Sequence, residues 1–356
     1  MIRIAKPEFP ASSAPRIDAI VPDAVLPGGE VELQGSALGP VADKRPLAVL
    51  DGALAPVLLS RPTRMSIRIP ESVPDSPEGG RLEIRQNGTT SNAVQIRIGR
   101  LLAENVNPVA SPVIDAEGNI YTTLSGPRGE KMPVSIYRIS PEGDMDAFAT
   151  DILNPTGLAL DTDGMLYVSS RHDGTIHRVT PQGAVSVFVE SMGVATGLAF
   201  DQAGNLYCGD RSGTIFKIAR DRQIFVFATM EPSVSAYHMA FGLDGTLFVS
   251  GPTTSSNDAV YAIDHDGTSS VYYRGLGRPQ GMAVDIAGSL YVTASHRGRR
   301  GVLRLPIDRT PADHPELVIS GSGMVGLAFA PSGSTIVATN TAIYDVALGV
   351  EGLRYI

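Results

Sequence analysis

The chain has 356 residues, of which 43% are hydrophobic and only 19% are charged, and it is rich in glycine (38) and proline (26). That composition favours short strands joined by turns over long charged helices. The formal net charge of −8 argues against nucleic-acid and anionic-membrane partners, the single cysteine excludes an internal disulfide, and no apolar run is long enough to span a membrane.

Residues 1–13, MIRIAKPEFPASS, are predicted to be a leader ahead of the first domain. This segment lacks the apolar core of a signal peptide, which predicts a cytoplasmic protein for the chain as it begins here. Residues ahead of Met1 would change that expectation to export.

Residues 14–99 contain six strand-like runs separated by proline and glycine: IDAIVP, EVELQGS, PLAVLDG, SIRIPE, GRLEIRQNG and NAVQIRIG. Runs of this kind predict a small β-sandwich. The segment resembles an IPT/TIG domain, an immunoglobulin-like module. The matching residues are Ile17, Ile20, Pro22, Gly28, Gly29, Val31, Leu33 and Gly35. The resemblance implies a spacer or a binding module.

From residue 100 onward one phrase recurs six times, as DAEGNIY, DTDGMLY, DQAGNLY, GLDGTLF, DIAGSLY and APSGSTI. Its glycines are spaced 46, 40, 41, 43 and 45 residues apart. Each copy has four short apolar runs, and four strands per repeat of this length are typical of a propeller blade. Residues 100–356 are therefore predicted to form a six-bladed β-propeller, and the whole chain to be all-β. Either RLLAE (100–104) or GLRYI (352–356) supplies the strand that completes the last blade.

The stretch GLALDTDGMLYVSS and its counterparts resemble the NHL-repeat and SMP-30/gluconolactonase group of six-bladed propellers, over about residues 100–356. Because one architecture hosts many functions, the repeat is specific for the fold and weak for the activity.

Residues that begin the inner strands of a propeller, and loops that follow the second strands, surround one opening of the axial channel. If the protein is an enzyme, the sequence nominates His238 as a general base there, with Asp210 orienting it or binding a metal, and Arg171 or Arg211 stabilising an oxyanion. The candidate ligand-binding residues are Thr156, Thr196, Tyr237, Gln280, Arg171, His172, Arg211, His296 and Asn340.

The resemblance also implies a divalent cation at this opening, bound by a glutamate in an EGP or ESP run and by asparagine and aspartate from other blades. This sequence has Ala110, Thr156 and Gln280 at matching places, which leaves Asp210 as the obvious carboxylate. One carboxylate does not hold calcium tightly or activate a metal-bound water. We therefore expect neither a metal nor another cofactor.

A second precedent in this class of fold is the peptidyl-hydroxyglycine lyase, which binds zinc through histidines. His172, His238 and His296 are candidates for such a site, with water as the fourth ligand. Solvated or hydrogen-bonded histidines are the favoured alternative.

Two functions remain open from the sequence. The favoured interpretation is a non-catalytic binding or scaffold protein that recognises a small molecule or a protein through the opening and the β-sandwich, because the cation ligands are missing and an accessory domain is present. The alternative is a hydrolase or lyase acting on a small lactone-type substrate, which the family resemblance and the polar opening favour.

Overall fold

Strands and tight turns account for the regular structure in the computed structural model of the chain, which describes residues 14–41, 44–73, 79–254, 257–305 and 314–353. The described residues contain no α-helix, so the all-β prediction is confirmed for them. The predicted leader, residues 1–13, lies outside the described residues. The chain divides into two compact units, one running to Ile98 and including Ile319–Gly321, the other holding the rest.

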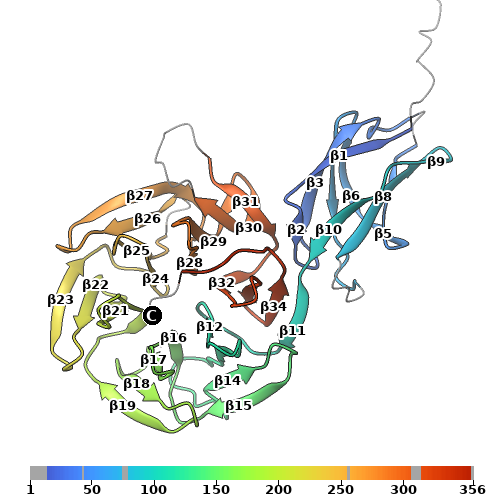
Figure 1. The fold of residues 1–356 in the computed structure, drawn as a ribbon. Coiled ribbons are helices and arrows are strands. Elements are labelled where there is room, and N and C mark those ends of the chain that lie inside the picture. Colours follow the sequence, from blue (N-terminus) through green and yellow to red (C-terminus); the bar gives the residue numbers. More distant parts are fainter. Residues whose placement is uncertain (1–13, 42–43, 74–78, 255–256, 306–313, 354–356) are drawn as a thin grey trace, which may run out of the picture. The chain divides into compact units, whose positions relative to one another are not determined.

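The N-terminal unit contains two sheets (Figure 1). The first has the strand order β1 (Arg16–Val21), β3 (Glu30–Ser36), β7 (Arg64–Arg68), β6 (Val57–Arg61). The second has the order β2 (Ala24–Val25), β10 (Val94–Ile98), β8 (Gly80–Gln86), β4 (Leu47–Leu50), β5 (Ala53–Ala55), with β9 (Thr89–Thr90) pairing β8.

One hydrophobic core joins the two sheets of this unit. Alternate residues of β3, such as Val31 and Leu33, point into it, and so do Leu82 and Ile84 of β8. The two-residue period of a strand puts these side chains on one face of each sheet, so the apolar alternation in the sequence fixes which faces meet.

The second unit consists of six groups of four antiparallel strands arranged around one axis, and we call each group a blade (Figure 1). From the axis outward, blades 1 to 3 contain β12 (Val113–Ile114), β13 (Ile120–Thr123), β14 (Ile136–Ile139), β15 (Met145–Ala149); β16 (Pro155–Leu160), β17 (Leu166–Ser170), β18 (Ile176–Val179), β19 (Val185–Val189); and β20 (Ala195–Phe200), β21 (Leu206–Asp210), β22 (Thr214–Ile218), β23 (Ile224–Thr229).

Blades 4 to 6 follow the same order. They contain β24 (His238–Phe241), β25 (Leu247–Ser250), β26 (Asp258–Ile263), β27 (Ser269–Leu276); β28 (Met282–Val284), β29 (Leu290–His296), β30 (Arg299–Leu305), β31 (Glu316–Ser320); and β32 (Met324–Phe329), β33 (Thr335–Thr339), β34 (Ala342–Val346), β11 (Arg100–Glu104).

The repeated phrase forms the turn between the first and second strands of each blade. Its six glycines all have positive φ, for example +77° at Gly204, a conformation that side chains with a Cβ resist. The aspartate of the phrase accepts from the turn, as Asp201 does from the Asn205 N–H at 2.8 Å, and the Tyr207 hydroxyl donates to the same carboxylate at 3.3 Å. The phrase is thus a self-contained turn that ties its aspartate to the second strand.

Inner strands contact one another in cyclic order, β12 to β16, β20, β24, β28 and β32, and β32 contacts β12. Glycines at their beginnings permit this closeness. A Cβ on Gly197 would lie 2.4 Å from the Tyr237 carbonyl oxygen of the next blade, and one on Gly157 would lie 2.2 Å from that of Thr196. Neighbouring backbones therefore approach more closely than any side chain would allow.

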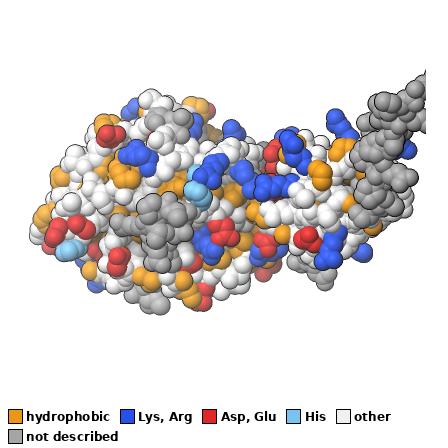
Figure 2. Space-filling model, turned by 90° about the horizontal axis from the view of Figure 1, so that it is seen from above, with side chains coloured by type: hydrophobic (Ala, Val, Ile, Leu, Met, Phe, Trp, Pro, Cys, Tyr) orange, Lys and Arg blue, Asp and Glu red, His pale blue; other side chains and the backbone are white. Residues whose placement is uncertain are grey.

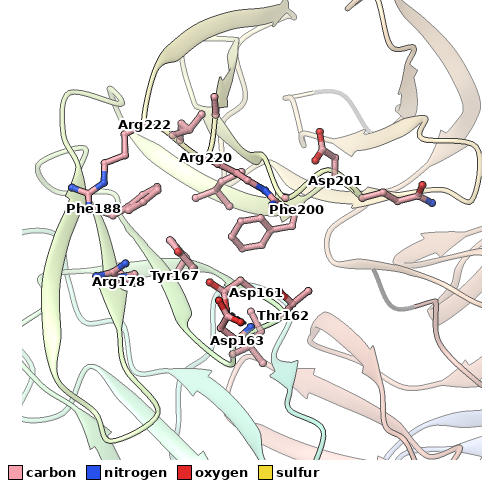
Figure 3. Close-up of a pocket in the computed structure, with 16 residues that line it drawn as sticks. Asp161, Thr162, Asp163, Tyr167, Arg178, Phe188, Phe200, Asp201, Arg220 and Arg222 are labelled. Atoms are coloured by element: carbon pink, nitrogen blue, oxygen red, sulfur yellow. Dashed lines mark hydrogen bonds between the residues drawn. The ribbon is translucent and has the colours of Figure 1, made fainter. Parts of the chain in front are cut away.

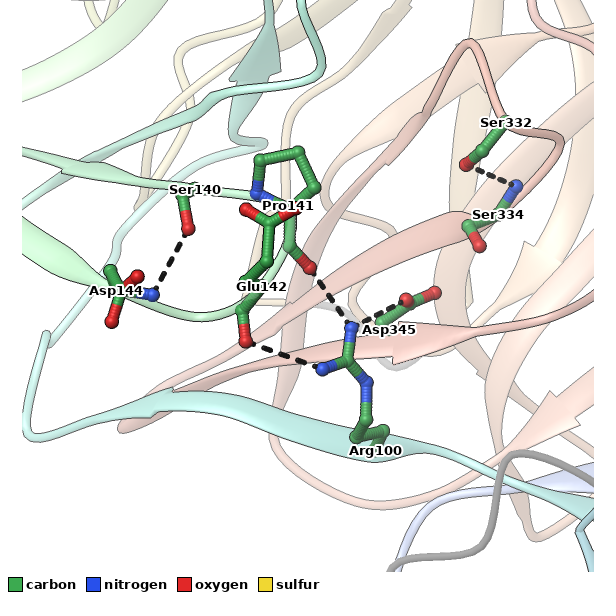
Figure 4. A network of polar contacts seen from close by, with 8 residues as sticks. All are labelled: Arg100, Ser140, Pro141, Glu142, Asp144, Ser332, Ser334 and Asp345. Carbon is green, nitrogen blue, oxygen red and sulfur yellow. Dashed lines mark hydrogen bonds and ion pairs between the residues drawn. The ribbon is translucent and has the colours of Figure 1, made fainter.

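The first and last parts of this unit meet in blade 6. Strand β11 pairs antiparallel with β34, so RLLAE is the stretch that completes this blade. Arg100 adds side-chain contacts (Figure 4): it donates to the Pro141 carbonyl at 3.0 Å and lies 3.3 Å from Asp345 Oδ2. Arg100 thus links blade 6 to a turn of blade 1.

On the face seen in Figure 2, acidic and basic side chains are interspersed with apolar ones. Nowhere in the described ranges is there a helix with the length and apolar character needed to cross a bilayer.

Replacing Arg100 with alanine should lower the free energy of unfolding by about 1 kcal/mol, because a partly exposed ion pair and a bond to a carbonyl are lost together. Arg138→Ala is the matched control, since Arg138 and Asp146 form a longer, more exposed pair at 3.7 Å. Urea unfolding measures both. Equal losses in the two variants would show that Arg100 does not stabilise blade 6 against blade 1.

Cys208 lies in the core of blade 3 with 0% exposure, and burial raises the pKa of its thiol to about 12. A buried protonated thiol does not react with a disulfide reagent. We expect Ellman's reagent to label no thiol in the native protein and one per chain in denaturant. Rapid labelling of the native protein would contradict this placement.

Candidate functional site

The amino end of the ring, defined as the end at which the inner strands begin, holds the residues that the sequence nominated. Strand pairing places them there: Ala195 at the start of β20 pairs with Asp210 at the end of β21, and His238 at the start of β24 pairs with Ser250. Loops that follow the second strands therefore lie beside the starts of the inner strands.

His238 occupies a position at which most blades have glycine. The register equates it with Gly157 and Gly197, because Leu158, Leu198 and Met239 pair with equivalent residues of the second strands. Sequence analysis had grouped His238 with Thr156 and Thr196, one residue earlier. The repeat carries the same equivalence, since Gly157, Gly197 and His238 each stand seven residues before the turn glycine of their own blade.

The imidazole of His238 is 4% exposed. Burial lowers the pKa of His238 to about 4, because the interior does not solvate an imidazolium ion. At neutral pH His238 is therefore a neutral imidazole with a lone pair on one ring nitrogen. That is the form required of a general base.

Asp210 does not orient His238 in this structure. Its Oδ1 accepts from the Val194 N–H at 2.8 Å, and its Oδ2 accepts from the Ser212 hydroxyl. Successive residues of a strand face opposite sides. Tyr237 packs with the core that faces blade 3. Burial, and then the nearby Asp210 carboxylate, raise the pKa of Tyr237. His238 follows Tyr237 in the chain and therefore lies on the other face of β24. The carboxylate and the imidazole are thus held apart.

Three of the candidate ligand-binding residues are buried and hydrogen-bonded to the backbone. Thr156 and Thr196 are 2% and 1% exposed; Thr156 donates to the Asn154 carbonyl, and Thr196 donates to that of Gly209 at 2.8 Å. Tyr237 is 1% exposed and donates to the Glu231 carbonyl. Thr196 also links two blades, because its hydroxyl oxygen accepts from the Tyr237 N–H at 3.2 Å.

Arg171 and Arg211 occupy equivalent positions after β17 and β21. Arg171 Nη2 donates to the Gly126 carbonyl at 2.9 Å, and Arg211 Nη2 donates to the Val234 carbonyl at 2.8 Å. His172 is exposed and lies against Gly129, where a Cβ would be 3.6 Å from its ring. The structure thus brings the two arginines and His172 to one sector of the amino end.

The other candidates come from blades 5 and 6. Gln280 is half-buried, and its carbonyl accepts from the Ser250 hydroxyl at 2.9 Å. His296 is half-buried, with Nδ1 3.4 Å from the Gly275 carbonyl oxygen and Nε2 buried without a partner among the described residues. Asn340 is exposed, with its amide oxygen close to Gly323.

The residues present do not fit a divalent cation at this end. The positions of the family ligands hold Ala110, Thr156 and Gln280, and the Asp210 oxygens are taken by the protein's own donors. Within the described ranges no three His, Cys, Asp or Glu side chains lie close enough to bind one ion, so His172, His238 and His296 do not form the zinc site considered from the sequence. We derive no chemistry through a metal.

Two cavities that sequence reasoning missed lie at other levels of the ring. The larger, of about 740 Å³, follows the axis and is lined by inner-strand residues from Ser111 onward and by Gly352 and Leu353. The smaller, of about 320 Å³, lies between blades 2 and 3 (Figure 3). It is lined by the turn aspartates Asp161 and Asp201. Their recurrence in the repeat is the sequence signal that could have pointed to this cavity.

No family model matches the chain, and no curated protein sequence matches it. Solved structures do. A structure named as a gluconolactonase matches with a TM-score of 0.58 and 19% identity, covering 72% of this chain and 94% of that one. A gluconolactonase from Xanthomonas campestris matches with a TM-score of 0.56 and 15% identity, covering 69% of this chain and 88% of that one.

A third match is virginiamycin B lyase from Staphylococcus aureus, in a catalytically inactive histidine-to-alanine variant with quinupristin. Its TM-score is 0.50 at 12% identity, and the match covers 95% of this chain and 96% of that one. At these identities the matches establish the fold. The second unit is a β-propeller like those of the SMP-30/gluconolactonase-like and virginiamycin B lyase proteins.

These matches correct the favoured interpretation of the sequence. The sequence favours a non-catalytic binding or scaffold protein, whereas the neighbours described here are named as enzymes, gluconolactonases and a lyase. The missing cation ligands argue against a metal-dependent mechanism, but they do not argue against catalysis by a general base without a metal.

The stability of the protein should depend on pH through His238. Its folded pKa of about 4 lies below the unfolded value near 6.5, so the unfolded state binds the proton first. This contribution is fully present above pH about 6.5 and falls by up to about 3 kcal/mol as the pH drops to about 4.

Urea unfolding at several pH values tests this expectation. His238→Gln should flatten the pH dependence between those limits, whereas His265→Gln, which changes an exposed histidine, should leave the slope of the wild type. A His238→Gln profile that parallels the wild type would mean that His238 is protonated in the folded protein.

Proposed function

We propose that the protein is a hydrolase or lyase that opens the ester bond of a small lactone-type substrate at the amino end of the ring. The observation that carries the proposal is the state of His238: a neutral, nearly enclosed imidazole at the end of the ring where the inner strands begin.

His238 is the general base of the proposed reaction. In hydrolysis it takes a proton from water, the hydroxide adds to the lactone carbonyl, and the ring C–O bond breaks. The imidazolium then returns the proton to the departing oxygen, so no proton is gained or lost by the enzyme. In elimination the same nitrogen takes a proton from carbon as the C–O bond breaks.

Two observations support His238 in this role. Its imidazole projects at a position where most of the other blades have glycine, so no other blade has an imidazole there. In addition, the matched virginiamycin B lyase is catalytically inactive when a histidine is replaced by alanine. The pKa of about 4 makes the base weak and keeps it unprotonated at every physiological pH.

The arginines and Asp210 have separate roles in the proposal. Arg171 and Arg211 hold the substrate at the end of the ring where His238 lies. Asp210 holds the turn between β21 and β22 and the segment that enters β20, since it accepts from Ser212 and Val194. It acts on the site through the position of the Arg211 loop.

We further propose that residues 100–356 form a six-bladed propeller of the NHL/SMP-30-like type, and residues 14–99 an IPT/TIG-like β-sandwich after a leader of residues 1–13. The cyclic contacts of the inner strands and the pairing of β11 with β34 support the first part. The two sheets around one core support the second.

A lactone and ester screen tests the proposed activity. His238→Ala should reduce kcat/KM by at least about 100-fold, the usual contribution of a general base, because no other neutral base takes its place. His265→Ala, with its exposed side chain, is the matched control and should retain full activity. Hydrolysis that survives in His238→Ala would refute the assignment of the base.

The pH profile gives an independent check. With a pKa of about 4, His238 should produce no acid limb near pH 6.5, and kcat/KM should fall only as the pH approaches about 4. An acid limb centred near 6.5 would contradict the assignment of His238 as the base.

Reaction in ¹⁸O-labelled water separates the two chemistries. Hydrolysis by attack at the carbonyl incorporates the label into the product carboxylate, whereas elimination leaves the product unlabelled and introduces a double bond. Mass spectrometry of the product reads the difference.

A further inference from the structure

Three arginines converge at the amino end of the ring without a carboxylate partner. Arg171 and Arg211 follow the second strands of adjacent blades, and Arg128 lies in the segment after β13. Within the described ranges none of the three forms an ion pair. Asp210 precedes Arg211, and its oxygens are occupied by Val194 and Ser212.

Neutral backbone carbonyls hold the guanidinium groups in place. Arg171 Nη2 donates to the Gly126 carbonyl, and Arg211 donates to those of Val234 and Ser233, with Nε 3.5 Å from the Ser233 oxygen. A carbonyl fixes the orientation of an arginine and leaves its charge uncompensated. The side chains are therefore positioned while their positive charge remains available.

The surroundings of Arg171 destabilise its charged form. It is half-buried, and its Nε is enclosed without a hydrogen-bond partner among the described residues. The pKa of Arg171 is lowered, first by burial and then by the positive charges of Arg211 and Arg128. A group with these surroundings is destabilised until an anion comes to it.

We propose that this arginine cluster binds the anionic group of the substrate, a carboxylate or a phosphate, through Arg171 and Arg211. The inference rests on the proposed function and narrows it: the lactone or ester opened by His238 carries an oxyanion of its own. A guanidinium fork matches the two oxygens of such a group and orients the molecule at the end of the ring where His238 lies.

Calorimetric titration of the full chain with inorganic phosphate, and separately with citrate, tests the cluster without requiring catalysis. Wild type should bind at least one of the two, more weakly as salt is raised. Arg171→Gln should weaken binding by about 10-fold or more, because a hydrogen bond to a charged group is lost. Arg274→Gln, on the exposed outer strand β27, removes the same charge elsewhere and should bind as wild type does.

Further variants separate the possible failures. Arg171→Lys keeps the charge and loses the fork, so an intermediate affinity is expected, and thermal melting of each variant checks its folding. His238→Ala should bind phosphate or citrate as wild type does, so loss of activity there with retained binding supports both proposals. Absence of binding to wild type, or equal affinity in Arg171→Gln and wild type, overturns the arginine cluster while leaving the role of His238 intact.

A kinetic measurement distinguishes the cluster from an oxyanion hole. For an anionic substrate, Arg171→Gln should raise KM with little change in kcat, and a neutral lactone should be unaffected. A fall in kcat for both substrates would overturn the assignment to the substrate's own anion.

Discussion

The close approach of neighbouring inner strands is the constraint on which the ring depends. Backbone meets backbone where Gly197 faces the Tyr237 carbonyl, and a single methyl group there would collide. Such contact is possible only because the repeat supplies glycine at that level. Each sheet alone leaves both faces bare, so the same approach also buries the apolar faces of adjacent blades. Blade 4 departs from this rule, because His238 stands at the position that these glycines occupy in their own blades.

That departure explains how a regular scaffold acquires a chemically distinct residue. The surrounding blades are held by their own contacts, so they tolerate a polar ring at that position. Burial keeps the imidazole neutral, and the low dielectric of the junction makes an ion formed there expensive. An imidazole in such a position stays unprotonated at neutral pH and can accept a proton, but its low pKa makes it a weak base.

The charged side chains at the two ends of the ring have different hydrogen-bond partners. At the turn end, aspartates such as Asp201 accept hydrogen bonds from the N–H groups of their own turn and from tyrosine hydroxyls. At the amino end, by contrast, Arg171 and Arg211 are bonded to carbonyls and keep their charge. The repeat thus uses its acidic residues for folding and leaves an excess of positive charge where the inner strands begin.

Much of the fold was determined by the sequence itself. Turn glycines, apolar alternation and a repeat of constant length are local signals, and they predicted strands and blades because each depends on neighbours along the chain. The choice of β11 over the C-terminal residues as the closing strand depends on pairing between distant segments, and only the tertiary structure decided it. The same holds for part of the site: the sequence nominated His238 and Asp210 together, but strand alternation faces them apart. Local patterns specify which elements form, whereas the direction in which a side chain points depends on register irregularities and on packing between blades, which no short stretch encodes.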